Sequence, residues 1–113
     1  MAFQRGDVVL VPFPFTDLSA KRARPAVVVS VPEYERTIGD VIVAQITSRY
    51  HSLPTDYALQ DWQSAGLLKP SIGKAKLATI NASLVQLRIG QLSNRDLEEV
   101  NKRLKLGIGA LRR

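Results

Sequence analysis

Two apolar stretches decide the fold of this chain, Asp7-Val8-Val9-Leu10-Val11-Pro12 and Ala26-Val27-Val28-Val29-Ser30-Val31. The first is rich in β-branched residues, which favour strands. The second follows Pro25 as an almost continuous apolar run, which is typical of a strand buried in the core. A third strand is predicted over Asp40–Thr47, directly after the turn residue Gly39. Because these strands follow one another closely, we expect a meandering antiparallel sheet.

Most of the remaining chain before its last part also indicates β-structure. We predict a strand over Leu77–Ile80 and a short one over Leu87–Leu92. Before them, Asp61–Ala65 is typical of a single helical turn that Gly66 ends in the left-handed conformation.

The end of the chain predicts one long helix. Ser93 is a good N-cap residue, and Asp96 follows in the capping-box position. Acidic residues occupy its early turns and basic residues its later ones, which matches the helix macrodipole. Apolar residues at helical spacing predict a buried stripe formed by Leu97, Val100, Leu104, Ile108 and Leu111.

The length and the composition predict one small globular domain. The 113 residues leave room for a single core, and hydrophobic residues make up 45% and charged residues 23% of them. Short strands followed by one helix predict a mainly β fold with α, a partly open barrel of the SH3 type over residues 1–113.

Several classes of chemistry are excluded by residue usage. The absence of cysteine excludes disulfides, thiol nucleophiles and cysteine-ligated metals. A single histidine, His51, excludes catalysis by a histidine pair. No Gly-x-Ser-x-Gly elbow occurs, and the carboxylates lack metal-ligand spacing, so neither a serine hydrolase nor a metal site is expected. The sequence shows no apolar signal core and no run of membrane-spanning length, so we expect a cytoplasmic protein with no membrane partner.

The charge balance favours an anionic partner. The formal net charge is +6, and nucleic acid is the first candidate for a small basic domain. Lys21-Arg22-Ala23-Arg24 is the densest basic cluster and could neutralise phosphates, although basic runs are often only solvated loops. Arg24 differs from its neighbours because it adjoins Pro25 and the buried strand, where its guanidinium fork suits a phosphate.

Two further segments offer polar or aromatic groups. Thr47-Ser48-Arg49-Tyr50-His51 leaves the third strand with hydroxyls, a cation and an imidazole, although Thr and Ser at strand ends often cap turns. Trp62, with Tyr57 nearby, could stack a base or could pack in the core.

The sequence resembles the MazF/PemK toxins of bacterial type II toxin–antitoxin systems. The resemblance rests on two blocks, Gly6–Ser19 and Arg24–Ser30, and continues in Ile46-Thr47-Ser48, Gly66–Ser71 and Lys76–Ile80. It implies an SH3-like (MazF/CcdB-like) barrel and a homodimer. It also implies cleavage of single-stranded RNA without a metal or other cofactor, and silencing by a cognate acidic antitoxin.

The resemblance also implies roles for particular residues. The Arg of the family's Arg-Pro block falls on Arg24 and the Thr ending the third strand falls on Thr47, so these two are expected to be catalytic. Some members place an Arg-x-Asp pair where this chain has Lys74-Ala75-Lys76, and the tail lacks the Trp-Gly-Ile ending of gyrase-poisoning toxins. The residues expected to bind RNA are Thr16, Asp17, Ser19, Lys21, Arg22, Ser48, Arg49, His51, Lys74 and Lys76.

The inventory of residues suits RNA cleavage by the RNA's own 2′-hydroxyl. Such an enzyme must position the phosphate, stabilise its extra charge and move two protons, and Arg24 and Thr47 suit the first two tasks. Arginine is a poor proton acceptor, so the base stays open among His51, Asp17 and Ser19. The alternatives are a non-catalytic SH3-like module that binds RNA or protein, and a gyrase-targeting toxin of the same fold.

Overall fold

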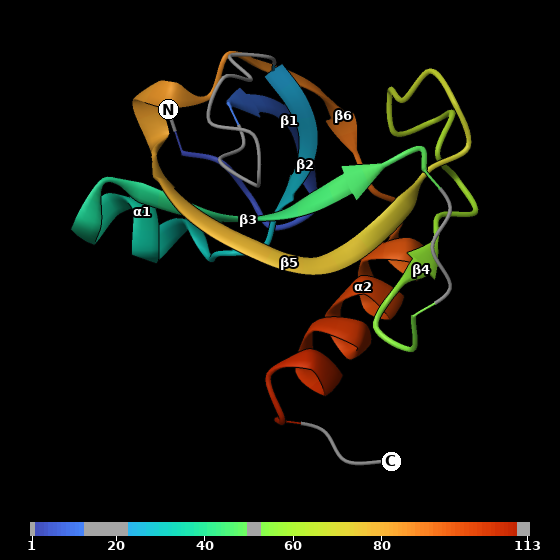
Figure 1. Cartoon of the computed structure of the whole chain (residues 1–113). Coiled ribbons are helices and arrows are strands. Elements are labelled where there is room, and N and C mark those ends of the chain that lie inside the picture. Colours follow the sequence, from blue (N-terminus) through green and yellow to red (C-terminus); the bar gives the residue numbers. More distant parts are fainter. Residues whose placement is uncertain (1, 13–22, 50–52, 111–113) are drawn as a thin grey trace.

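The computed structural model describes residues 2–12, 23–49 and 53–110, whose strands form one curled antiparallel sheet (Figure 1). The strand order in this part of the chain is β4-β5-β3-β2-β1-β6. The elements are β1 (Asp7–Pro12), β2 (Ala23–Val28), α1 (Pro32–Ile38), β3 (Asp40–Thr47), β4 (Tyr57–Ala58), β5 (Ile72–Asn81), the 3₁₀ helix η1 (Ala82–Leu84), β6 (Leu87–Gln91) and α2 (Asn94–Gly107).

The first three strands form the predicted antiparallel meander. β1 pairs with β2 and β2 with β3, while β6 adds to the outer side of β1 and β5 to the outer side of β3. β1 and β3 have the predicted bounds, but β2 begins earlier than predicted and ends at Val28. Beyond this end the Val29 N–H still donates to the Ile42 carbonyl at 2.9 Å, and the Ser30 hydroxyl accepts the Ile42 N–H at 3.0 Å.

Both faces of the sheet are buried at its central strands, β1 to β3, whereas β5 and β6 carry several exposed residues. One face packs under α2 and the segment between β4 and β5, and the other lies within the curl of the sheet (Figure 1). A strand buried on both faces is apolar at successive positions, whereas a strand with one solvated face is apolar at alternate positions. The continuous apolar run of the second predicted strand has this cause. The first cluster includes Val8, Val27, Ala44, Ile46, Leu67 and Val100, and the second includes Val9, Val11, Ala26, Val28, Val41 and Val43.

A helix stands where the sequence pattern predicts only strands and loops. α1 begins with Pro32 in its first turn, carries Glu33 and Glu35 near its positive end, and ends at Gly39, whose φ is +85°. It buries no residue, so it lacks the apolar stripe by which a helix is recognised in a sequence. α1 joins the ends of β2 and β3 that lie away from Arg24 and Thr47.

The terminal helix begins as predicted but ends earlier. Ser93 caps α2, and its hydroxyl accepts the Asp96 N–H at 3.3 Å. Val100 is buried in the predicted stripe, whereas Ile108 lies beyond the helix and is 66% exposed. The stripe stops there because the chain turns at Gly109, whose φ is +78°. Leu111 lies outside the described residues. No helix in the described ranges combines the length and the apolar character needed to cross a membrane.

Candidate functional site

A cavity of about 500 Å³ opens beside the central strands of the sheet, at the end where β2 begins and β3 ends. Strands β1, β2, β3 and β6 supply part of its wall, and the segment that joins β4 to β5 supplies the rest. The lining residues are Leu10, Arg24, Pro25, Gln45, Ile46, Thr47, Ser48, Gly66, Leu67, Leu68, Lys69, Ser71 and Ile89.

The cavity brings together the two residues that the resemblance implies are catalytic. The β2–β3 register pairs Ala26 with Gln45 and Val28 with Val43. Arg24 precedes Ala26 by two residues and Thr47 follows Gln45 by two, so both lie just beyond this pairing, and both line the cavity.

The two side chains differ in how they are held. Arg24 is exposed, and its guanidinium makes no hydrogen bond or ion pair with any residue that the structure describes. The Thr47 hydroxyl accepts the Arg49 N–H at 3.2 Å, so it caps the end of its strand as well as facing the cavity. Ser48 also lines the cavity, whereas Arg49 is exposed and lies outside its lining.

The described cavity lining is basic. It contains Arg24 and Lys69 and no Asp or Glu, so it suits an anion such as a phosphate. Within ranges 2–12, 23–49 and 53–110, no group of three or more His, Asp or Glu side chains is arranged to hold a metal ion.

Two predicted RNA-binding lysines lie on β5 rather than in the cavity. The Lys74 ammonium is 3.2 Å from a carboxylate oxygen of Asp56, and their side chains are only 14% and 5% exposed. Lys74 therefore neutralises a buried acid between β5 and the segment before β4. Lys76 is exposed on the same strand and outside the cavity lining.

The other predicted RNA-binding residues lie in the two segments, 13–22 and 50–52, outside the described residues. They are Thr16, Asp17, Ser19, Lys21, Arg22 and His51.

The far wall of the cavity belongs to the segment between β4 and β5, which we call the wall loop (residues 59–71). Gly66 has a φ of +88°, as predicted, and a Cβ there would lie 2.2 Å from the Ile89 carbonyl oxygen. A Cβ on Gly90 would lie 2.1 Å from the Ala65 oxygen. The wall loop therefore touches the β6 backbone directly, which only glycine permits. Nothing in the sequence around Gly90 signals this contact.

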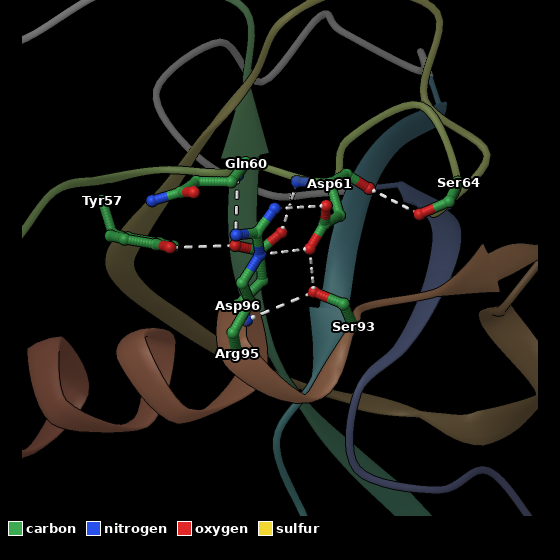
Figure 2. Close-up of polar contacts among 7 residues, drawn as sticks. All are labelled: Tyr57, Gln60, Asp61, Ser64, Ser93, Arg95 and Asp96. Atoms are coloured by element: carbon green, nitrogen blue, oxygen red, sulfur yellow. Dashed lines mark hydrogen bonds and ion pairs between the residues drawn. The ribbon is translucent and has the colours of Figure 1, made fainter.

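The first half of the wall loop is bound to the start of α2 by a polar cluster (Figure 2). The buried Asp96 carboxylate accepts hydrogen bonds from the Tyr57 hydroxyl at 2.9 Å, the Gln60 N–H at 3.1 Å and the Asp61 N–H at 2.8 Å. The predicted capping box is thus only half formed, because Asp96 faces the wall loop instead of returning to the Ser93 N–H.

The second carboxylate of the cluster, Asp61, points back at α2. It accepts hydrogen bonds from Arg95 Nε and Nη2, both at 2.7 Å, and from the Ser93 hydroxyl at 2.6 Å. The bonds from Arg95 and then from Ser93 lower the pKa of Asp61 to about 2. Burial and then the hydrogen bond to Asp96 raise the pKa of Tyr57 to about 12. At neutral pH the cluster therefore holds a carboxylate at Asp61 and a protonated phenol at Tyr57.

Two residues considered for base stacking have structural partners instead. The Tyr57 hydroxyl is bonded to Asp96, and the Arg103 guanidinium lies 5.7 Å from the centre of the Tyr57 ring. Trp62 packs against the first core cluster, which is the core reading of this residue. Leu68 and Lys69, in contrast, line the cavity, although the family resemblance implies no role for them.

Comparisons with known proteins agree with this geometry. Residues 4–108 match the family described as PemK-like, MazF-like toxin of type II toxin-antitoxin system. No curated protein matches the sequence significantly.

Solved structures with the same fold are numerous. One is an endoribonuclease in complex with its cognate antitoxin from a mycobacterial species, with a TM-score of 0.81, 21% identity and coverage of 99% of this chain and 100% of that one. MazF from Deinococcus radiodurans has a TM-score of 0.79 and 20% identity, covering 96% of this chain and 98% of its own. The Mycobacterium tuberculosis toxin MazF-mt6 has a TM-score of 0.75 and 18% identity, covering 91% and 96%. The predicted MazF-like fold, a curled sheet with a C-terminal helix, is confirmed.

Proposed function

The chain belongs to the PemK-like, MazF-like toxins of type II toxin–antitoxin systems, and from this premise we propose that it is an endoribonuclease that cleaves single-stranded RNA in the cavity of Arg24 and Thr47. The observation that carries the proposal is the position of these two residues on opposed strands in one basic cavity. Similar structures include proteins described as endoribonucleases, which supports the same activity.

The proposed reaction is an attack by a 2′-hydroxyl of the RNA on the adjacent phosphorus. The new P–O bond forms as the bond to the 5′ oxygen of the next nucleotide breaks, which leaves a cyclic phosphate and a free 5′-hydroxyl. Because the nucleophile belongs to the substrate, the proposed reaction needs no metal-activated water. The enzyme must stabilise the additional negative charge on the phosphate and move two protons.

Arg24 is proposed to stabilise this charge. Its guanidinium is bound to no described residue, so it can direct two N–H groups at the phosphate without breaking a contact within the described part of the chain. Preorganised donors at a developing oxyanion are usually the largest catalytic term. Thr47 is proposed to hold a non-bridging oxygen, because its hydroxyl proton remains available while its oxygen accepts the Arg49 N–H.

The proposed proton acceptor is one of three residues, Asp17, Ser19 or His51. Among the described lining residues there is no carboxylate or imidazole. Of the three candidates, histidine is the residue type whose ordinary pKa lies nearest neutrality.

The proposed partner is a cognate acidic antitoxin in the cytoplasm, with the toxin acting as a homodimer. Solved relatives include MazE–MazF complexes and an endoribonuclease with its antitoxin, which supports such a partner here. A net charge of +6 on each chain favours both RNA and an acidic antitoxin.

The decisive experiment is cleavage of a long mixed-sequence RNA by purified protein with excess chelator. We expect discrete cuts, found by primer extension, whose upstream fragments end in cyclic phosphate. The matched control is Arg24→Ala protein purified in parallel by the same procedure. Contaminating nucleases would cleave RNA equally in both preparations. Intact RNA with folded wild-type protein would contradict the proposed activity and favour a binding module, and cleavage abolished by chelator would contradict the metal-free mechanism.

A further inference from the structure

The wall loop connects α2 to the cavity. Its base is closed by a hydrogen bond from the Leu59 N–H to the Ser71 carbonyl at 2.9 Å, next to the β4–β5 pair. Its first half is bound to α2 by Asp96, and its second half lines the cavity. A displacement of the wall loop where it contacts α2 would therefore also move the residues of the loop that line the cavity.

The Asp96 carboxylate is hydrogen-bonded to the wall loop and to Tyr57 of β4, which precedes it. It is completely buried, at 0% exposure, and the three groups that donate to it are Tyr57, Gln60 and Asp61. Two of these donors are backbone N–H groups of the wall loop. Without the Asp96 carboxylate, these two N–H groups would have no hydrogen-bond acceptor on α2. The carboxylate also lies in the first turn of α2, where the helix dipole favours its charge. The loop is held at its start by a strong, charged acceptor.

The segment between Asp96 and the cavity is stiff. Within it the Ala65 N–H donates to the Asp61 carbonyl at 3.2 Å, and the Leu67 N–H donates to the Trp62 carbonyl at 3.1 Å. Ala65 and Leu67 are buried in the first core cluster. The close contact of Gly66 with the β6 backbone fixes the distance between the wall loop and β6. The position set at Asp61 is therefore carried to residues 67–69.

The end of this segment presents an apolar and a basic side chain together. Leu68 is 94% exposed although it is a large hydrophobic residue, and exposed Lys69 follows it. Both line the cavity that contains Arg24 and Thr47. An apolar side chain next to a cation matches a nucleotide, whose base has an apolar face and whose phosphate is anionic.

We propose that the wall loop is a preformed subsite for the nucleotide beside the cleaved phosphate, with Leu68 against the base, Lys69 near its phosphate, and Asp96 as the positioning residue that holds both in place. The inference rests on the proposed RNA cleavage. It adds a substrate contact and a residue that acts from outside the cavity through the wall loop.

The contact is tested with Leu68→Ala, and Ile108→Ala serves as the matched control because Ile108 is exposed outside the cavity. We expect Leu68→Ala to raise KM about tenfold with kcat nearly unchanged, as for the loss of one buried apolar contact. Ile108→Ala should match the wild type. A wild-type KM for Leu68→Ala would overturn the subsite.

The positioning role is tested with Asp96→Asn, and Asp7→Asn is the control because Asp7 is a buried carboxylate that accepts the Gln4 N–H and pairs with Arg88. We expect only Asp96→Asn to raise KM. The double variant with Leu68→Ala should be no worse than the worse single variant, because both changes remove the same contact. Additive losses would overturn the role of Asp96, since a general loss of stability does not depend on Leu68.

Trp62 gives a readout independent of activity. It is the only tryptophan of the chain and lies in the wall loop, against the core. Asp96→Asn should shift the Trp62 emission toward that of a solvated indole. An unchanged emission spectrum would overturn the positioning role of Asp96. If Asp96→Asn does not fold, Asp61→Asn loosens the same loop by weakening the contacts to Arg95 and Ser93, and it should give the same change in KM.

The experiment separates failure of this inference from failure of the proposed function. If the wild type does not cleave RNA, the proposed function fails. If the wild type cleaves RNA and Arg24→Ala does not, while Leu68→Ala and Asp96→Asn keep the wild-type KM, only the subsite fails.

Discussion

Arg24, near the start of β2, and Thr47, at the end of β3, line the same cavity, each two residues beyond the Ala26–Gln45 pair. The connection between these strands, α1, lies at the other end of the pair (Figure 1). The two candidate catalytic groups are therefore carried by paired strands of the sheet, a rigid support for a reaction that needs accurate placement.

Replacing Arg24 should abolish cleavage without unfolding the protein. Removal of one preorganised donor to a developing oxyanion costs about 100–1,000-fold in turnover. Arg24 makes no side-chain bond to a described residue, so Arg24→Ala should keep the wild-type melting temperature. Arg24→Lys should fail as well, because an ammonium cannot reproduce the guanidinium fork. Single-turnover cleavage rates measure both variants, and full activity of folded Arg24→Ala would remove the assignment.

Thr47→Val should lower turnover about fivefold to tenfold, the effect of one lost hydrogen bond, while RNA affinity changes little. The exposed Arg49 N–H loses its protein acceptor in this variant but can bind water. Thr47→Ser, which keeps the hydroxyl, is the control and should retain most activity. A kcat of Thr47→Val equal to that of the wild type would leave Thr47 only its role at the end of the strand.

Gly66→Ala should destabilise the protein much more than Gly39→Ala. Both glycines have positive φ, +88° and +85°, which costs about 1–2 kcal/mol for alanine. Only Gly66 adds a clash, because its Cβ would lie 2.2 Å from the Ile89 oxygen while Gly39 has nothing within 4 Å. Overpacking adds roughly 1–3 kcal/mol. Urea unfolding of the two variants tests the difference, and equal free energies of unfolding would show that the wall loop does not press on β6.

Stability should fall at alkaline pH through Tyr57. Its pKa is raised from 10.0 to about 12 in the folded protein, so the fold favours the protonated phenol. This contribution is fully present below pH 10 and is lost as the pH rises through about 12. The difference in unfolding free energy between the wild type and Tyr57→Phe should shrink over this range. A difference independent of pH would show that the Tyr57–Asp96 bond does not control this titration.

The acidic tail of the antitoxin should compete with RNA for the toxin. Two chains of a dimer at +6 each make a strongly positive surface, and a disordered acidic peptide can replace phosphates there. We expect tail affinity for Arg24→Ala protein to decrease with salt. Simultaneous binding of RNA and tail in a competition titration would contradict occlusion, and a salt-independent affinity would contradict its electrostatic origin.

Strands with strong local signals were predictable from the sequence. β3 has the predicted bounds because a largely apolar run follows the turn at Gly39 and has strand partners on both sides. α1 was missed because a helix that buries no residue carries no periodic apolar signal.

Side-chain roles that depend on distant contacts were not predictable. Asp96 has the signature of a helix cap, but its carboxylate is used by Gln60 and Asp61, which precede it by more than thirty positions. Lys74 matches a basic position of the family, yet its partner is Asp56, which approaches only when β4 pairs with β5. A local pattern cannot contain such pairings.

The contact of Gly66 with β6 divides the wall loop into two parts that tolerate substitution differently. Asp61 and Gly66 are held by contacts with α2 and β6, so folding opposes substitutions at these positions. Leu68 and Lys69 are exposed and support no core, so they can change without loss of stability. Substrate preference can therefore drift at these positions while the barrel stays intact, and libraries that seek new cleavage motifs should randomise them first.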